Sequence, residues 1–79
     1  MVKQTRPLYE IANDIKRDWT NVNFGAVPYL RAMESLDKIT DNFMFDSGKS
    51  IVMYFLSNAT GWRGETAKRI KKELKDMLK

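Results

Sequence analysis

The sequence predicts an all-α protein, a compact bundle of about four helices with a buried central helix at residues 47–59. Apolar residues recur at helical spacing in the first and last segments of the chain. Between those segments, an apolar run at residues 51–56 is bounded by helix-capping residues. Because 79 residues can bury only one small core, we expect a single helical domain over residues 1–79.

The first helix is expected over residues 7–19. Pro7 suits the first turn of a helix, where its missing N–H would have been unpaired in any case. Lys16 and Arg17 lie in the last turn, where the helix dipole favours positive charge. One apolar stripe at helical spacing is formed by Leu8, Ile11, Ala12, Ile15 and Trp19.

The second helix is expected from about residue 26 to residue 36 or 38. Asn23 or Gly25 can cap its start, and Pro28 fits within the first turn without breaking a hydrogen bond. Phe24, just upstream, is expected to pack back on the helix as a hydrophobic staple. Residues on one face of this helix are Val27, Leu30, Met33 and Leu36.

Residues 37–45 are the least regular stretch of the chain. A turn is expected at residues 40–42, and the apolar residues Phe43, Met44 and Phe45 follow it without a clear period. Two interpretations remain open for these three side chains. They either close one end of the core or form an exposed apolar tip, which would mark a site for a partner.

The third helix is expected over residues 47–59, with Asp46 or Ser47 as its N-cap. Its apolar run, residues 51–56, fits either a buried strand or the central helix of a bundle. The β-branched and aromatic residues favour a strand. We predict a helix because the segment between the caps is long for a strand, and because a lone strand would have no pairing partner.

The fourth helix is expected from about Trp62 to Leu78, or from Glu65 because Gly64 weakens the first turn. Its apolar residues fall within one arc, and its lysines gather on an adjoining flank. Together the four segments predict a core of Leu8, Ile11, Ile15, Trp19, Leu30, Met33, Leu36, Ile51, Val52, Phe55, Leu56, Ile70 and Leu74.

The net charge of +4 is unevenly distributed, because residues 47–79 hold eight basic and three acidic side chains. This excess indicates either an acidic partner, including the phosphates of a nucleic acid, or simply a solvated face. The candidate contacts for a nucleic acid or an acidic partner are Arg63, Lys68, Lys71, Lys72 and Lys75.

Trp62, Phe43 and Met44 are candidate contacts for a protein partner, because such side chains dominate protein interfaces. The alternative for Trp62 is structural, since a tryptophan beside a glycine often anchors the corner between two helices. A further argument for a protein partner is a surplus of large side chains. A core of this size cannot bury all of Tyr9, Tyr29, Phe43, Met44, Tyr54 and Met77.

Several classes of function are disfavoured. The chain has no cysteine and no histidine, so we expect no disulfide, no metal, no cofactor and no enzymatic activity. Gly48, Lys49 and Ser50 match the last three residues of the phosphate-binding loop motif, but that motif needs a second glycine at the position of Phe43. Glu10, Asp14 and Asp18 share a helical face and could bind a hard cation, although neighbouring basic residues explain them more simply.

The longest apolar run, six residues, is far shorter than a membrane span. The first seven residues lack the apolar stretch of a secretory signal, so a cytoplasmic protein is expected.

Three stretches resemble a family of small uncharacterised proteins from phages, prophages and mobile elements of Gram-positive bacteria. They are residues 23–30 (NFGAVPYL), 46–52 (DSGKSIV) and 55–67 (FLSNATGWRGETA). The resemblance covers nearly the whole chain but implies no activity, cofactor or catalytic residue. It implies a cytoplasmic accessory protein of a phage or mobile element.

The function expected from these observations is a non-enzymatic module that binds another protein, with a homodimer as one form of that interaction. The alternative is a nucleic-acid-binding protein that uses the basic flank of the last helix.

Overall fold

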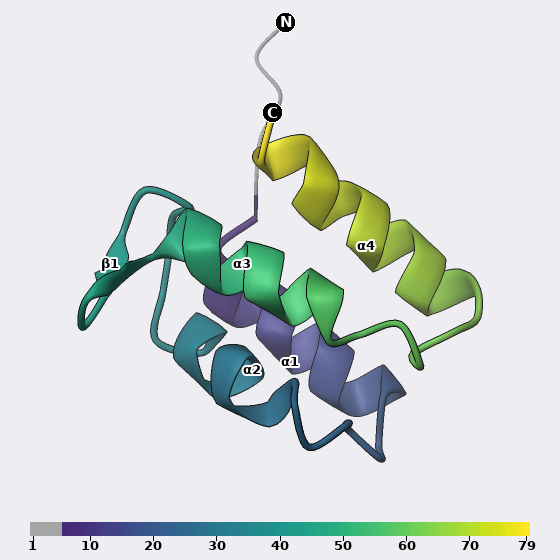
Figure 1. Cartoon of the computed structure of the whole chain (residues 1–79). Helices are drawn as coiled ribbons and strands as arrows, with labels where there is room; N and C mark the ends of the chain where they lie inside the picture. The colour runs from purple at the N-terminus through teal and green to yellow at the C-terminus, as the bar shows by residue number, and fades with distance from the viewer. Residues whose placement is uncertain (1–5) are drawn as a thin grey trace, which may run out of the picture.

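The computed structural model describes residues 6–79, which form four α-helices and one antiparallel β-hairpin (Figure 1). The chain is therefore mostly helical, and the first five residues of the expected domain 1–79 lie outside the described part. In chain order the elements are α1 (Leu8–Asp18), α2 (Val27–Met33), β1 (Asn42–Phe43), β2 (Asp46–Ser47), α3 (Gly48–Ser57) and α4 (Glu65–Met77).

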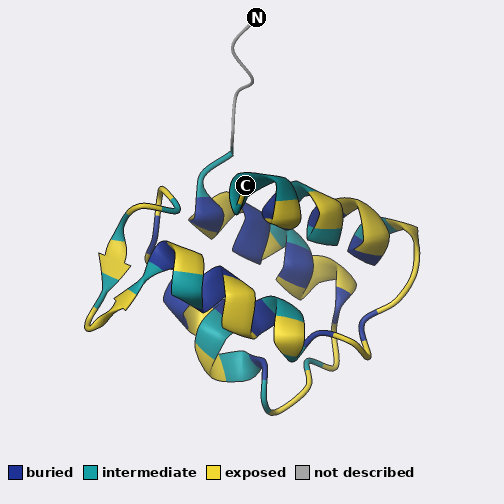
Figure 2. Cartoon of the chain, turned by 45° about the horizontal axis from the view of Figure 1, so that its top comes forward, coloured by how far each residue is buried: buried dark blue, intermediate teal, exposed yellow. Residues whose placement is uncertain are grey.

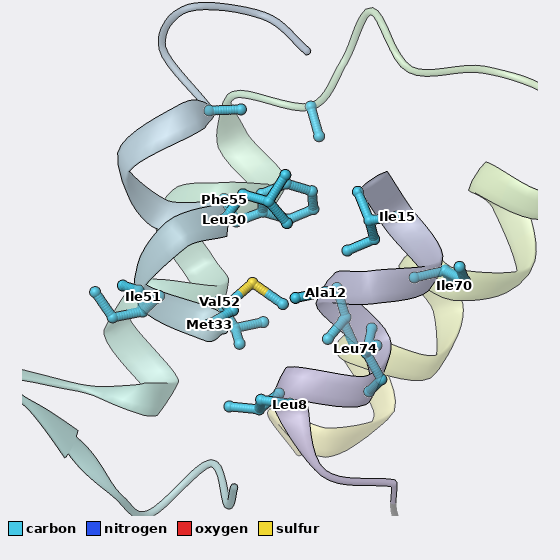
Figure 3. Packing of buried hydrophobic residues seen from close by; sticks show 14 of the residues in the cluster. Leu8, Ala12, Ile15, Leu30, Met33, Ile51, Val52, Phe55, Ile70 and Leu74 are labelled. Carbon is cyan, nitrogen blue, oxygen red and sulfur yellow. The ribbon is translucent and has the colours of Figure 1, made fainter. Parts of the chain in front are cut away.

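Helix α1 occupies the middle of the bundle. It packs against both α2 and α4, and Leu8 and Ile15 are completely buried among side chains of the other helices (Figure 3). The start of α1 is closed by the chain that follows α2. The backbone N–H groups of Leu8 and Tyr9 donate to the carbonyls of Asp37 (2.8 Å) and Leu36 (2.9 Å). These bonds satisfy donors that the first turn of a helix otherwise leaves unpaired.

Helix α2 begins within one residue of the expected position, but the expected staple before it and its expected end are not observed. The staple at Phe24 does not form, because this side chain is 92% exposed. The chain is held there instead by Asn23, whose side-chain amide donates to the carbonyl of Asn58 (3.0 Å). The helix ends at Met33 rather than at residue 36 or 38, because the backbone at residues 36–37 turns to cap α1.

The apolar run at residues 51–56 is helical, as predicted. Helix α3 begins after Ser47, whose side-chain oxygen accepts a hydrogen bond from the backbone N–H of Ser50 (3.1 Å). The expectation of a buried central helix at 47–59 is nevertheless wrong in one respect. Met53 and Tyr54 are 50% and 48% exposed, so one face of α3 is open to solvent. The reason is that α4 packs mainly on α1 and leaves that face uncovered.

A pure all-α fold is also not what forms, because residues 42–47 make a β-hairpin. Asn42 pairs with Ser47 and Phe43 with Asp46, so the two residues between them, Met44 and Phe45, form the turn. The backbone φ of Met44 is 57°, a value usually taken by glycine in such turns. This turn contains no glycine or asparagine, and the sequence therefore gave no hairpin signal.

The predicted core is confirmed at every position except one. Leu56 is only partly buried, whereas all other predicted residues belong to one buried cluster to which all four helices contribute side chains. In Figure 2 the buried residues line the inner sides of the helices. The cluster also includes residues that the sequence did not assign to it: Ala12, Ala26, Ala32, Ala59, Trp62 and Ala67. Within residues 6–79 no helix has the length and apolar character needed to cross a membrane.

Gly48 joins the hairpin to α3 at a point where two backbone segments nearly touch. Its N–H donates to the carbonyl of Asp41 (2.6 Å). A Cβ atom at Gly48 would lie 2.8 Å from the carbonyl oxygen of Ile39 and 3.0 Å from that of Lys38. Lack of space therefore requires a glycine here, and the resemblance to a phosphate-binding loop has a structural explanation.

We predict that Gly48→Ala lowers the free energy of unfolding by about 1–3 kcal/mol, because the new methyl group must displace backbone atoms. Gly61→Ala is the matched control, since nothing lies within 4 Å of a Cβ at that position. It should leave the stability unchanged or raise it by up to about 1 kcal/mol. Urea denaturation measures both variants, and equal stabilities would contradict the close approach at Gly48.

Candidate functional site

Trp62 forms the corner that joins α1, α3 and the start of α4. Its ring stacks on Trp19 with a centroid distance of 5.7 Å and an interplanar angle of 8°. It also meets the ring of Phe55 edge-on at 6.5 Å. The indole N–H donates to a carboxylate oxygen of Asp18 (2.8 Å), which satisfies the one polar atom of a side chain that is only 3% exposed.

This burial decides between the two interpretations of Trp62. The side chain anchors a helix corner and is not available on the surface, so it is not a contact for a partner. Lys71 covers the corner from α4. Its ammonium nitrogen donates to the carbonyl of Trp62 (2.6 Å) and lies 5.9 Å from the centroid of the ring. One of the predicted partner-binding lysines therefore has a structural contact of its own.

The remaining predicted cations lie along the same flank of α4. We define the basic edge as Arg63, Lys68, Lys71, Lys72, Lys75 and Lys79. Lys72 and Lys79 both approach Asp76, at 3.3 Å and 3.5 Å. Arg63, Lys68 and Lys75 are exposed, and none of them forms an ion pair with a carboxylate of residues 6–79.

The cations of the basic edge are close enough to influence one another. The pKa of Lys71 is lowered, first because burial disfavours its charged form and then because Lys75 and Arg63 repel it. The structure therefore brings Arg63, Lys71 and Lys75 together at the start of the basic edge. Lys71 and Lys75 are neighbours one turn apart on α4, whereas Arg63, which precedes the helix, is brought near Lys71 by the corner at Trp62.

On the opposite flank of α4, Glu73 is neutralised by Arg6, a residue that no sequence pattern singles out. Its guanidinium group binds both carboxylate oxygens of Glu73, each at 2.9 Å, and one of Asp14 at 2.5 Å. Glu10 lies 3.5 Å away. A bidentate pair of this kind is stronger and more directional than a single ion pair. Arg6 thus fastens α4 to α1.

The acidic face of α1 is accordingly occupied by basic partners. Asp14 binds both Arg6 and Arg17, and its pKa is lowered, chiefly by the hydrogen bond from Arg6. Asp18 accepts the indole N–H of Trp62. Among residues 6–79 no group of three or more acidic side chains is arranged to hold a metal ion. The carboxylates that share a face of α1 serve the packing of the helices.

The tip of the hairpin is the most exposed apolar feature of the described chain. Met44 is 83% exposed and Phe45 is fully exposed, and we call these two residues the hairpin tip. Phe43, the third member of the triplet, is partly buried and packs against the core. Phe43 therefore fits the first interpretation of this segment, closure of the core, and Met44 and Phe45 fit the second, an exposed apolar tip. Phe45 was not selected from the sequence, although it belongs to the same apolar triplet.

Comparison of the chain with protein-family models, with curated proteins and with solved structures found no match. The hairpin tip and the basic edge are therefore the features from which a function can be inferred.

We predict that Arg6→Met lowers the free energy of unfolding by about 1 kcal/mol, because partly exposed ion pairs contribute at most this order. It should also change the acid limb of the stability curve. Since the pKa of Asp14 is lower in the folded chain, Asp14 contributes stability above its unfolded pKa of about 4 and loses it as the pH falls through the folded pKa. This loss should shrink in Arg6→Met.

Urea denaturation between about pH 2 and pH 6 measures the effect. Arg31→Met is the control, because Arg31 is exposed and forms no ion pair within residues 6–79. An equal acid response in both variants would show that Arg6 is not the main cause of the shift at Asp14.

We predict that Lys75→Gln raises the pKa of Lys71 toward its ordinary value, because it removes a like charge. Burial remains, so the shift should be partial. The Cε chemical shift of Lys71, followed by NMR as the pH rises, measures it. Lys68→Gln should leave this pKa unmoved, since Lys68 is not among the groups that perturb it. No change in the Lys75 variant would rule out the proximity of the two amines.

Proposed function

We propose that the chain is a non-enzymatic module that binds a protein partner by inserting the hairpin tip into an apolar pocket of that partner. The observation that carries this proposal is the adjacency of two large apolar side chains, Met44 and Phe45, which are 83% and fully exposed. Single exposed apolar residues are common on protein surfaces. Two at the apex of one turn form a protruding apolar surface, and such surfaces mark interaction sites.

The hairpin is braced, which supports a role in recognition. Phe43 packs on the core below the turn, and the strand pairs on either side fix the register. The backbone N–H of Gly48, just after β2, donates to the carbonyl of Asp41, just before β1 (2.6 Å). This hydrogen bond closes the base of the hairpin. A braced tip loses little conformational entropy when it binds, so more of the burial energy remains as affinity.

The backbone conformation of Met44 also supports a role in recognition. A φ of 57° costs a non-glycine residue roughly 1–2 kcal/mol. Strained residues of this kind tend to occur where function requires a particular side chain. Glycine would relieve the strain at Met44 but would remove the thioether side chain from the tip. The presence of a bulky side chain at this strained position therefore supports a role in binding.

The mode of binding follows from the shape of the hairpin. Each strand has only two residues, too few to recruit a strand from a partner by backbone pairing. The side chains of the tip must then supply the affinity. Burial of a methionine or phenylalanine side chain contributes about 1.5–3 kcal/mol each. A second copy of the chain is one candidate partner, and a different protein with an apolar pocket is the other.

The setting that we propose is the cytoplasm of a bacterium carrying a phage or mobile element. It rests on the resemblance of residues 23–30, 46–52 and 55–67 to proteins of such elements. A protein that carries neither histidine nor cysteine suits an accessory role that depends on binding.

We predict that the double variant Met44→Gly/Phe45→Ser loses partner binding by about 100-fold or more, because it removes the two side chains that the partner would bury. Its fold should persist, since glycine accepts the positive φ. Sedimentation velocity tests self-association. Capture from a lysate of the native host, followed by titration with the purified captured protein, tests a different partner.

Phe24→Ser is the control, because Phe24 is 92% exposed but lies outside the hairpin. It should bind as the unaltered chain does. A monomer whose captured proteins are the same for all three chains would overturn the proposal.

A further inference from the structure

The outer side of α4 carries lysines at the spacing of successive helical turns. Lys68, Lys72 and Lys75 follow one another at i, i+4 and i+7 and are all exposed. They span about 10 Å of the helix axis. One strand of a nucleic-acid duplex carries a phosphate about every 3.4 Å along its axis. The row therefore matches about three phosphate-to-phosphate intervals of the duplex, the length of about four consecutive phosphates.

Two of the three charges of this row, those of Lys68 and Lys75, have no carboxylate partner within residues 6–79, whereas Lys72 pairs with Asp76. Glu73, on α4, is held by Arg6 on the opposite flank of the helix. Asp76 is shared between Lys72 and Lys79. Arg63, Lys68 and Lys75 form no ion pair with a described carboxylate. The basic edge therefore keeps an excess of positive charge directed at solvent.

The cations of helix α1, in contrast, are paired with carboxylates. Lys16 pairs with Glu34 at 3.5 Å, and Arg17 pairs with Asp14. Both cations of α1 thus have a carboxylate close by. The positive charge of the second half of the chain is concentrated where such partners are lacking.

The positive charges of the basic edge are also crowded together. Arg63 and Lys75 both lower the pKa of Lys71, which is also held against the carbonyl of Trp62. Converging cations repel one another, and a polyanion relieves several of these repulsions at once. A row of phosphates does so more effectively than a single carboxylate.

The surface of α4 lacks the aromatic side chains on which bases commonly stack. Trp62, the aromatic residue that Lys71 contacts, is buried in the corner beneath it. The segment from Glu65 to Met77 contains no aromatic side chain and no asparagine or glutamine. Such a surface can contact the phosphates but has little with which to distinguish sequences.

We propose that the basic edge binds the phosphate backbone of a nucleic acid without reading its bases. This site is separate from the hairpin tip and rests on different residues. The contact is electrostatic, so its affinity falls steeply as salt displaces the protein from the phosphates.

Fluorescence anisotropy with short labelled single-stranded and double-stranded DNA tests the proposal, at salt concentrations from about 50 mM to about 200 mM. We expect the logarithm of the binding constant to fall against the logarithm of salt with a slope of about −3. Lys68→Gln/Lys75→Gln should reduce this slope by about 2 and weaken binding at about 50 mM salt by at least about tenfold. The stronger of the two DNA arms identifies the form that is bound.

Arg31→Gln/Lys38→Gln is the control, because it removes the same charge from exposed positions outside the basic edge. It should bind almost as tightly as the unaltered chain, and so should the hairpin-tip variant. Absence of binding at low salt, or equal losses in both double variants, would overturn the proposal. Equally tight binding of poly-glutamate would assign the edge to an acidic protein instead.

Discussion

The packing of Trp62 against Trp19 and Phe55 is the contact on which the arrangement of the helices depends. It brings together residues from the end of α1, the last turn of α3 and the segment before α4. The hydrogen bond to Asp18 fixes the indole ring in one orientation, because a buried N–H without an acceptor would be costly. With this corner in place, α4 has one direction in which its apolar side meets α1.

That direction gives the two flanks of α4 different chemistry. Glu73 faces the N-terminal segment and is bound by Arg6, whereas Lys71 leans over Trp62 at the corner. The acidic flank is therefore used to hold the bundle together. The basic flank is left with cations that have no described counter-charge, and the net charge of the second half of the chain becomes a surface feature with a definite position.

The hairpin shows a second constraint, which is steric. Gly48 lies so close to the backbone at residues 38–39 that no side chain fits, and Phe43 fills the space beside the core. These two contacts fix the base of the hairpin and direct Met44 and Phe45 into solvent. The apolar tip and the basic edge thus have separate physical origins. The protein partner and the nucleic acid that we propose therefore contact different residues.

The sequence by itself determined the four helices and nearly all of the core, because apolar spacing and capping are local properties that each segment carries alone. It left open whether Trp62 is an anchor or a contact, and it missed the hairpin and the role of Arg6. Tertiary structure decided these points. The burial of Trp62 requires Trp19 and Phe55, and the hairpin requires the close approach of Gly48 to the backbone at residues 38–39. Arg6 acts through Glu73, sixty-seven positions away. Contacts between distant residues have no local pattern by which they could be predicted.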